Sequence, residues 1–259
     1  MNRRNHYGAL ILAGIFFGTT GTAQALGPKA ISGMTVGSAR LICGALFLWL
    51  FTYFSPKTST KIPKGDLWLA AIGIALYQLT FFSAVRSTGV AIGTVTALGS
   101  APALTGIVAF LITREKPSWR WFNATLITTC GIAVLANAKG FSHFNATGFA
   151  LAICAGASYS LFAVTSKRVL TSGVEIPRAM SRIFALAAVL ASPFLFIGNS
   201  HGLVSTKGML MVLWLGLIPT AFAYIAYAYG LHGVKASTAT TLILAEPATA
   251  TLLAAVVLG

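Results

Sequence analysis

The sequence predicts an all-α integral membrane protein, and its composition, its apolar runs and an internal repeat all point to that class. Of 259 residues, 56% are hydrophobic and only 8% are charged, whereas a soluble domain carries about a quarter charged residues. Successive apolar runs have the length of about 20 residues that crosses a bilayer. They must be helical, because backbone groups in lipid need partners within the segment and the runs are too long for barrel strands.

Nine such spans follow one another, and the loops between them leave no room for a separate soluble domain. They cover residues 7–26, 35–54, 67–86, 91–112, 119–138, 146–166, 178–198, 209–231 and 237–258. The first span imitates a secretory signal peptide, since Arg3-Arg4 precede it and Ala23-Gln24-Ala25 end it. We retain it as a membrane helix because Gly8-Ala-Leu-Ile-Leu-Ala corresponds to Gly148-Phe-Ala-Leu-Ala-Ile later in the chain.

The third and fourth spans have a second copy in the eighth and ninth. Residues 64–112 run Lys-Gly-Asp-Leu-Trp, an apolar span, and a second span interrupted by Pro102. Residues 207–258 run Lys-Gly-Met-Leu-Met, an apolar span, and a second span interrupted by Pro247. The matching spans lie five apart in the chain, so the repeated unit contains an odd number of helices. Such a unit must insert in the opposite direction when it is repeated once. Inverted repeats are typical of alternating-access carriers, which hold a small molecule near the midplane between them.

Charged residues indicate the orientation in the membrane. Lys and Arg total 18 against four Asp and Glu, for a net charge of +14. The basic residues lie between apolar runs and form no surface for nucleic acid. With the N-terminus inside, twelve of them fall on the cytoplasmic side and four on the other, as the positive-inside rule requires. We therefore expect a multi-pass protein of a bacterial inner membrane with a cytoplasmic N-terminus.

Two arginines depart from this pattern. Arg40 and Arg182 lie inside or at the edge of their spans and correspond to each other across the repeat. We expect them to snorkel toward the membrane surface or to pair with backbone carbonyls, with a direct contact to substrate as the alternative.

The layout resembles the drug/metabolite transporter superfamily, in its EamA family. The segments that carry the resemblance are Ala101-Pro102, Arg114-Glu115-Lys116-Pro117, Gly131-Ile-Ala-Val-Leu and Glu246-Pro247. It implies ten helices in two inverted five-helix repeats, here residues 1–139 and 140–259. On that expectation nine spans are present and the sequence ends at Gly259 before a tenth. Within the family, the chain is most similar to the YddG-type exporters of aromatic amino acids.

Glu246 is a candidate site residue because it is the only carboxylate deep inside a span. A charge there is costly unless it is paired, hydrated or protonated. Pro247 lacks an N–H and clashes with the carbonyl of Ile243, which predicts a bent helix and a free acceptor. A carboxylate beside a free carbonyl would hold an ammonium group or a proton. The structural alternative is that Glu246 binds hydroxyl groups on a neighbouring helix.

Aromatic and polar residues recur at helical spacing in the spans that the family uses to line its cavity. Packing and interfacial anchoring would explain some of them, but deep tyrosine hydroxyls need partners. An apolar pocket with a few hydroxyls and amides suits an amphipathic solute such as an aromatic amino acid. The substrate-binding candidates are Phe17, Thr20, Gln24, Tyr77, Gln78, Phe81, Tyr159, Phe162, Tyr224, Tyr227, Leu244 and Glu246.

The expected function is export of small metabolites from the cytoplasm, namely amino acids with aromatic ones favoured, by alternating access as two halves rock around a central cavity. Gly89, Pro102, Pro219 and Pro247 are the candidate bending points. The alternative is a general drug or cation exporter of the same fold, in which the Glu246 charge would be decisive.

Other chemistry has no support in the sequence. No phosphate-binding loop is present, so neither ATP nor another cofactor is expected. The three Cys and four His have no metal-ligand spacing and no neighbouring acids, which argues against a metal site and against an enzyme. A channel would need a continuous polar lining or rings of charge, and the polar residues here are isolated.

Overall fold

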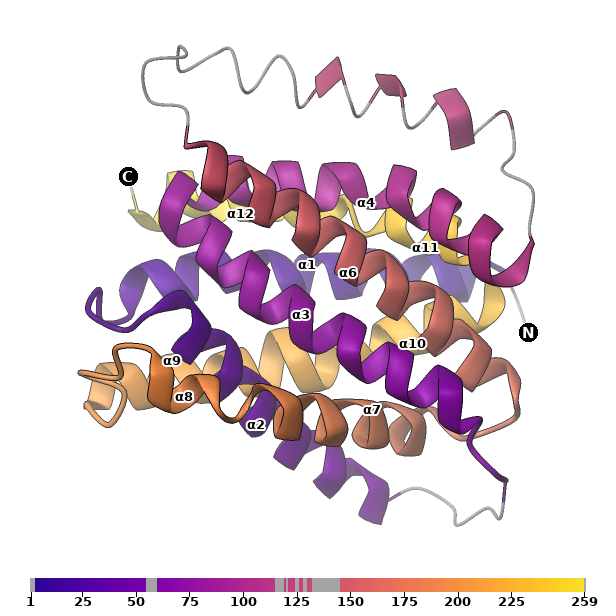
Figure 1. The fold of residues 1–259 in the computed structure, drawn as a ribbon, viewed down its shortest axis with the longest axis horizontal. Coiled ribbons are helices and arrows are strands. Elements are labelled where there is room, and N and C mark those ends of the chain that lie inside the picture. The colour runs from indigo at the N-terminus through magenta and orange to yellow at the C-terminus, as the bar shows by residue number, and fades with distance from the viewer. Residues whose placement is uncertain are drawn as a thin grey trace.

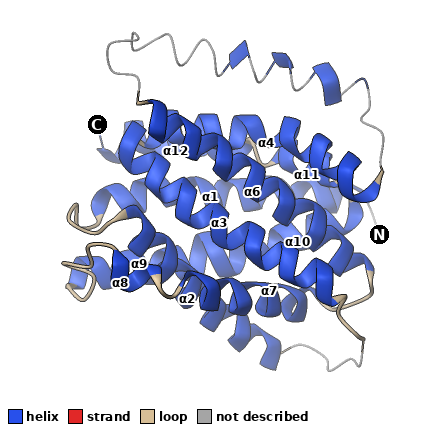
Figure 2. Ribbon diagram, in the orientation of Figure 1, coloured by secondary structure: helices blue, strands red, loops and turns tan. Residues whose placement is uncertain are grey.

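The computed structural model describes residues 3–54, 60–114, 119, 121–123, 126–127, 130–131 and 145–258. Every regular element in these residues is helical (Figure 2). Within the described residues, eight stretches are long and apolar enough to cross a membrane, which confirms the all-α membrane class. The span expected at 119–138 lies largely outside the described residues. The count of nine spans and the division into two inverted repeats stay predictions.

The first four spans match their predicted ranges to within four residues at each end. They are α1 (Arg3–Leu26), α2 (Gly33–Tyr53), α3 (Lys64–Thr88) and α4 (Val90–Thr113). Gly89 alone separates α3 from α4 and has φ of +85°, a backbone conformation that favours glycine. Pro102 lies inside α4, which continues through it.

Of the remaining described spans, Ala146–Thr171 is one continuous helix, and the other three are built from shorter helical pieces. The elements are α6 (Ala146–Thr171), α7 (Ile176–Ala191), α8 (Phe194–Ile197), α9 (Thr206–Gly216), η2 (Leu217–Phe222), α10 (Ala223–Gly233), α11 (Ala236–Leu242), α12 (Ala245–Leu253) and η3 (Ala254–Leu258). The segments η2 and η3 are π-helical. In sequence order these pieces form the spans Ile176–Ile197, Thr206–Gly233 and Ala236–Val257.

The span around Pro219 is interrupted by a π-helical turn. Proline leaves the carbonyl four residues earlier without its helical donor, and here that carbonyl belongs to Leu215. The Thr220 hydroxyl donates to the Leu215 carbonyl at 2.7 Å. The break at Pro219 is therefore repaired locally by the next side chain.

The last span breaks one turn before Pro247, between α11 and α12. The backbone N–H of Glu246 donates to the carbonyl of Ile243 at 2.8 Å. The expectation of a free Ile243 carbonyl is therefore wrong. Because α11 ends at Leu242, the chain makes a tight turn that supplies this carbonyl with a new donor.

Contacts between the predicted halves dominate the packing. The five most extensive helix pairs in the described chain are α3–α6, α4–α6, α2–α7, α1–α10 and α1–α12, and each joins residues 1–139 to residues 140–259. The helices α3 and α6 cross the front of the molecule side by side (Figure 1). They approach closely at Gly73, where a Cβ would lie 2.7 Å from the backbone nitrogen of Phe162. A small residue at such a crossing lets two membrane helices pack backbone to backbone.

Candidate functional site

The aromatic candidates meet in one buried cluster inside the bundle. They come from α1, α3, α6 and α10, and each is at most 4% exposed. Ring centroids lie 5.2 Å apart for Tyr77 and Tyr159, and 4.8 Å apart for Phe17 and Tyr224, within the range of favourable aromatic contacts. Further ring contacts join the other members to these pairs. We call this set the aromatic cluster: Phe17, Tyr77, Phe81, Tyr159, Phe162, Tyr224 and Tyr227.

Several polar groups in and beside the aromatic cluster have no hydrogen-bond partner among the described protein atoms. Both amide atoms of Gln78 are buried in this state, and so are the hydroxyls of Tyr159 and Tyr227. These two hydroxyls interact with each other, but not in hydrogen-bonding geometry. Leaving a buried polar group unpaired costs about 1–3 kcal/mol. The groups therefore hold hydrogen-bonding capacity that a ligand can use.

Thr20 and Gln24 share the buried side of α1 with Phe17, as their spacing predicts. The Thr20 hydroxyl and both Gln24 amide atoms are also without a partner in the described part of the chain. No ring contact or hydrogen bond of the described residues links either side chain to the aromatic cluster. The structure places them farther along α1, beyond the rings.

Arg40 is buried in the interior, with 2% of its surface exposed. Its Nε donates to the Thr220 hydroxyl at 2.8 Å, and its Nη2 donates to the Pro219 carbonyl at 2.6 Å. The guanidinium carbon lies 5.6 Å from the ring centroid of Phe82, in cation–π range. The expectation that Arg40 pairs with a backbone carbonyl is confirmed, and the carbonyl belongs to the π-helical turn of η2.

Glu246 lies in the first turn of α12 and is 4% exposed. It interacts electrostatically with Arg40, Tyr77 and Tyr224. Within the described residues, Arg40 and Glu246 do not form an ion pair, and no hydroxyl donates to the Glu246 carboxylate. The structural alternative for Glu246 therefore gains no support. Leu244 is half-buried in the turn before α12 and packs on the hydrophobic core.

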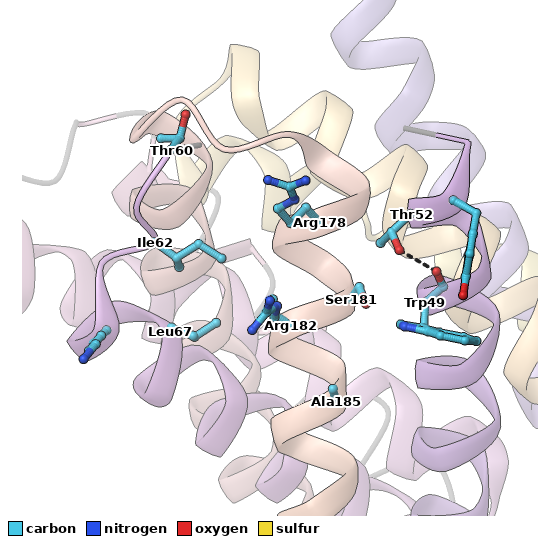
Figure 3. Close-up of a pocket in the computed structure, with 11 residues that line it drawn as sticks. Trp49, Thr52, Thr60, Ile62, Leu67, Arg178, Ser181, Arg182 and Ala185 are labelled. Carbon is cyan, nitrogen blue, oxygen red and sulfur yellow. Dashed lines mark hydrogen bonds between the residues drawn. The ribbon is translucent and has the colours of Figure 1, made fainter. Parts of the chain in front are cut away.

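Arg182 has a different environment from Arg40, its predicted counterpart across the repeat. It is exposed and lines a cavity of about 1080 Å³ between α2, α7 and the start of α3. Figure 3 shows Arg178 and Arg182 on α7, across from Trp49 and Thr52 on α2. Arg178 also forms an ion pair of 3.7 Å with Glu175. Arg40 and Arg182 therefore lie in different surroundings, one buried and one exposed.

The substrate-binding candidates do not line this cavity or two smaller ones. A cavity of about 650 Å³ lies between α4, α6 and the start of α11, and one of about 570 Å³ lies between α1 and α9. Because the rings of the aromatic cluster contact one another across α1, α3, α6 and α10, they fill the space between these helices. Access for a solute therefore requires the helices to separate.

Sequence reasoning missed part of this site. For Arg40 a substrate contact was only the alternative to a structural role, although its position inside a span was a signal that could have placed it among the candidates. It also missed Phe184 on α7, whose ring centroid lies 4.5 Å from that of Tyr224. No local signal marked Phe184, since the chain has 17 Phe and their type alone does not distinguish core packing from a site.

Comparisons with known proteins agree with this architecture. The model of the family described as "EamA-like transporter family" matches residues 6–137 and 146–259. The chain is 36% identical to "Uncharacterized transporter YwfM" of Bacillus subtilis, covering 96% of this chain and 84% of that protein. It is 26% identical to "Uncharacterized transporter YdfC" of the same organism, covering 82% of this chain and 69% of that protein.

A solved structure, titled "Crystal structure of protein", has a similar fold. It matches with a TM-score of 0.79 and covers 98% of this chain and 88% of its own. The sequence identity is 19%, so this likeness shows the fold alone.

Proposed function

The chain belongs to the EamA-like transporter family, and from that premise we propose that it exports amino acids, aromatic ones favoured, from the cytoplasm. It is a multi-pass membrane transporter and not an enzyme. The proposal includes an inner-membrane location with the N-terminus in the cytoplasm, which rests on the distribution of loop charge.

The observation that carries the proposal is the aromatic cluster with its unpaired polar groups. A solute with an aromatic ring can replace ring–ring contacts that the cluster makes with itself. The Gln78 amide and the hydroxyls of Tyr159 and Tyr227, which lack partners in the described chain, supply hydrogen bonds for polar atoms of the solute. Mostly apolar walls with a few convergent polar groups are typical of small-molecule sites.

The positions of the helices that hold the cluster support alternating access. Its rings come from α1 and α3 in one predicted half and from α6 and α10 in the other. Separating the halves on one side of the membrane would expose the cluster to that side. Gly89 lies at the α3–α4 junction, Pro219 in the π-helical turn, and Pro247 just after the α11–α12 break. These positions are suited to bending, whereas Pro102 lies within a continuous helix.

A general drug or cation exporter is the second candidate, and the buried Glu246 favours it. The electrostatic interaction between Arg40 and Glu246 argues against it. A cation that approaches Glu246 would also meet the Arg40 charge in a medium of low dielectric constant, where repulsion is strong. A solute that carries both charges has no such penalty, which supports the amino-acid proposal.

An efflux assay in cells tests the proposal. Bacteria with and without the expressed protein are loaded with a phenylalanine-containing dipeptide, and phenylalanine that appears outside is followed over time. Faster release of phenylalanine than of threonine from a matched dipeptide is expected. Equal release with and without the protein would contradict the proposal, provided that the protein is present in the membrane.

A further inference from the structure

Two groups that can carry opposite charges are buried inside the bundle without touching each other. Arg40 and Glu246 are 2% and 4% exposed. They interact electrostatically, yet they form no ion pair in the part of the chain that is described. Buried opposite charges are stabilised most when they make direct contact or share hydrogen-bonding partners. Because they make no direct contact, each group keeps the capacity to pair with a ligand group of opposite charge.

The Arg40 side chain is fixed in place. Pro219 and Thr220 take hydrogen bonds from its Nη2 and Nε, and both residues belong to the π-helical turn, midway along a span of 28 residues. A guanidinium group has five N–H donors, so these two bonds leave donors for an anionic ligand. The bonds to η2 therefore orient the guanidinium group and leave some of its N–H donors free for a ligand.

The backbone of Glu246 is fixed as well, because α1 packs directly on it. A Cβ at Gly14 would lie 3.2 Å from the backbone nitrogen of Glu246, and one at Gly18 would lie 2.9 Å from its backbone carbonyl oxygen. Its carboxylate accepts no hydrogen bond from the described residues. It therefore presents an acceptor at a defined position.

We propose that Arg40 and Glu246 bind the two charges of a zwitterionic α-amino acid, the α-carboxylate at Arg40 and the α-ammonium at Glu246. This inference rests on the proposed function and specifies its site. The phenol groups of Tyr77 and Tyr224 lie within electrostatic range of both Arg40 and Glu246. Both tyrosines are members of the aromatic cluster, so the side chain of the amino acid enters the cluster between them.

This arrangement selects for solutes that carry both charges. Charge-assisted hydrogen bonds are about twice as strong as neutral ones. A solute with only an ammonium or only a carboxylate leaves one buried protein charge without a partner, and such sites reject incomplete ligands strongly. We expect each incomplete ligand to bind at least ~10-fold more weakly than the amino acid.

Competition in proteoliposomes tests the proposal on the unmodified protein. Vesicles preloaded with unlabelled phenylalanine take up labelled phenylalanine in the presence of phenylalanine, phenethylamine or 3-phenylpropionate. Phenethylamine lacks the carboxylate and 3-phenylpropionate lacks the ammonium group. Each should inhibit at least ~10-fold more weakly than phenylalanine. Equal inhibition by either analogue would overturn the site assignment while leaving the amino-acid function intact, whereas no counterflow by any amino acid would overturn both.

Substitutions assign each charge to its residue. Glu246→Gln should narrow the difference in inhibition strength between phenylalanine and 3-phenylpropionate. Arg40→Gln should narrow the corresponding difference between phenylalanine and phenethylamine. Arg182→Gln, at the exposed counterpart of Arg40, should change neither. A purely structural role would lower transport without changing how strongly each analogue inhibits relative to phenylalanine. An unchanged inhibition ratio of phenylalanine to 3-phenylpropionate in a folded Glu246→Gln variant, verified by its thermal unfolding, would overturn the proposal.

Discussion

The Nε of Arg40 lies 2.8 Å from the hydroxyl oxygen of Thr220, although 180 residues separate them in the chain. The same hydroxyl donates to the carbonyl of Leu215, which Pro219 deprives of its helical donor. Thr220 thus completes the π-helical turn and fixes a buried cation at once. Because α2 and η2 belong to different predicted halves, this bond also joins those halves.

Thr220→Val should destabilise the protein, because it keeps the shape of the side chain and removes the hydroxyl. The Arg40 Nε and the Leu215 carbonyl would both lose a buried partner, at a cost of about 1–3 kcal/mol each. Thermal unfolding in detergent measures the effect. Thr220→Ser retains the hydroxyl and should unfold much closer to the unmodified protein. Equal stability of the Val and Ser variants would show that these bonds contribute nothing.

Tyr227→Phe should lower phenylalanine transport without lowering stability. The Tyr227 hydroxyl is buried and has no hydrogen-bond partner in the described structure, so its removal relieves a desolvation cost of about 1–3 kcal/mol. Counterflow and thermal unfolding are measured on the same preparation. Tyr229→Phe is the matched control on α10, since Tyr229 is half-buried and outside the aromatic cluster. Unchanged transport by Tyr227→Phe would remove this hydroxyl from the site.

Gly73→Ala should separate α3 from α6 and impair both stability and transport. The added methyl group would lie 2.7 Å from the Phe162 nitrogen and 2.9 Å from the Ser158 oxygen, both backbone atoms that cannot rotate away. Overpacking of this kind typically costs about 1–3 kcal/mol. Gly65→Ala on the same helix meets no atom within 4 Å and should be neutral or slightly stabilising. Indistinguishable thermal unfolding of the two variants would contradict the close packing.

Lys167→Met should loosen the end of α10. The Lys167 Nζ donates to the carbonyls of Leu231 and His232 at 2.8 Å and to that of Val234 at 2.7 Å. A cation at the C-terminus of a helix satisfies free carbonyls and complements the helix dipole. We expect a loss of about 2–3 kcal/mol in unfolding free energy, measured by chemical denaturation. Lys235→Met, at an exposed lysine nearby, should have little effect, and equal losses in both variants would contradict a specific role.

The helices themselves were predictable, because span length and apolar composition are local properties. The range 67–86 corresponds to Lys64–Thr88 in the structure. The burial of Glu246 was predictable for the same reason. Its backbone geometry was not, because the proline rule states which helical bond is lost and does not state how the chain turns to replace it.

The assembly of the site depends on contacts between distant segments, which no local pattern contains. Helical spacing put Tyr224 and Tyr227 near one another on a helix, but it did not indicate that Phe162 and Phe184 would meet them. The partners of Arg40 lie 179 and 180 residues away. Their recognition required the three-dimensional fold.

Counterflow in liposomes tests directly whether the protein carries aromatic amino acids. The protein is reconstituted into vesicles preloaded with unlabelled phenylalanine, and uptake of labelled phenylalanine, threonine and a lipophilic cation is compared. We expect saturable counterflow with phenylalanine preferred over threonine and no counterflow of the cation. Preference for the cation, or no counterflow of any of the three by folded protein, would contradict it.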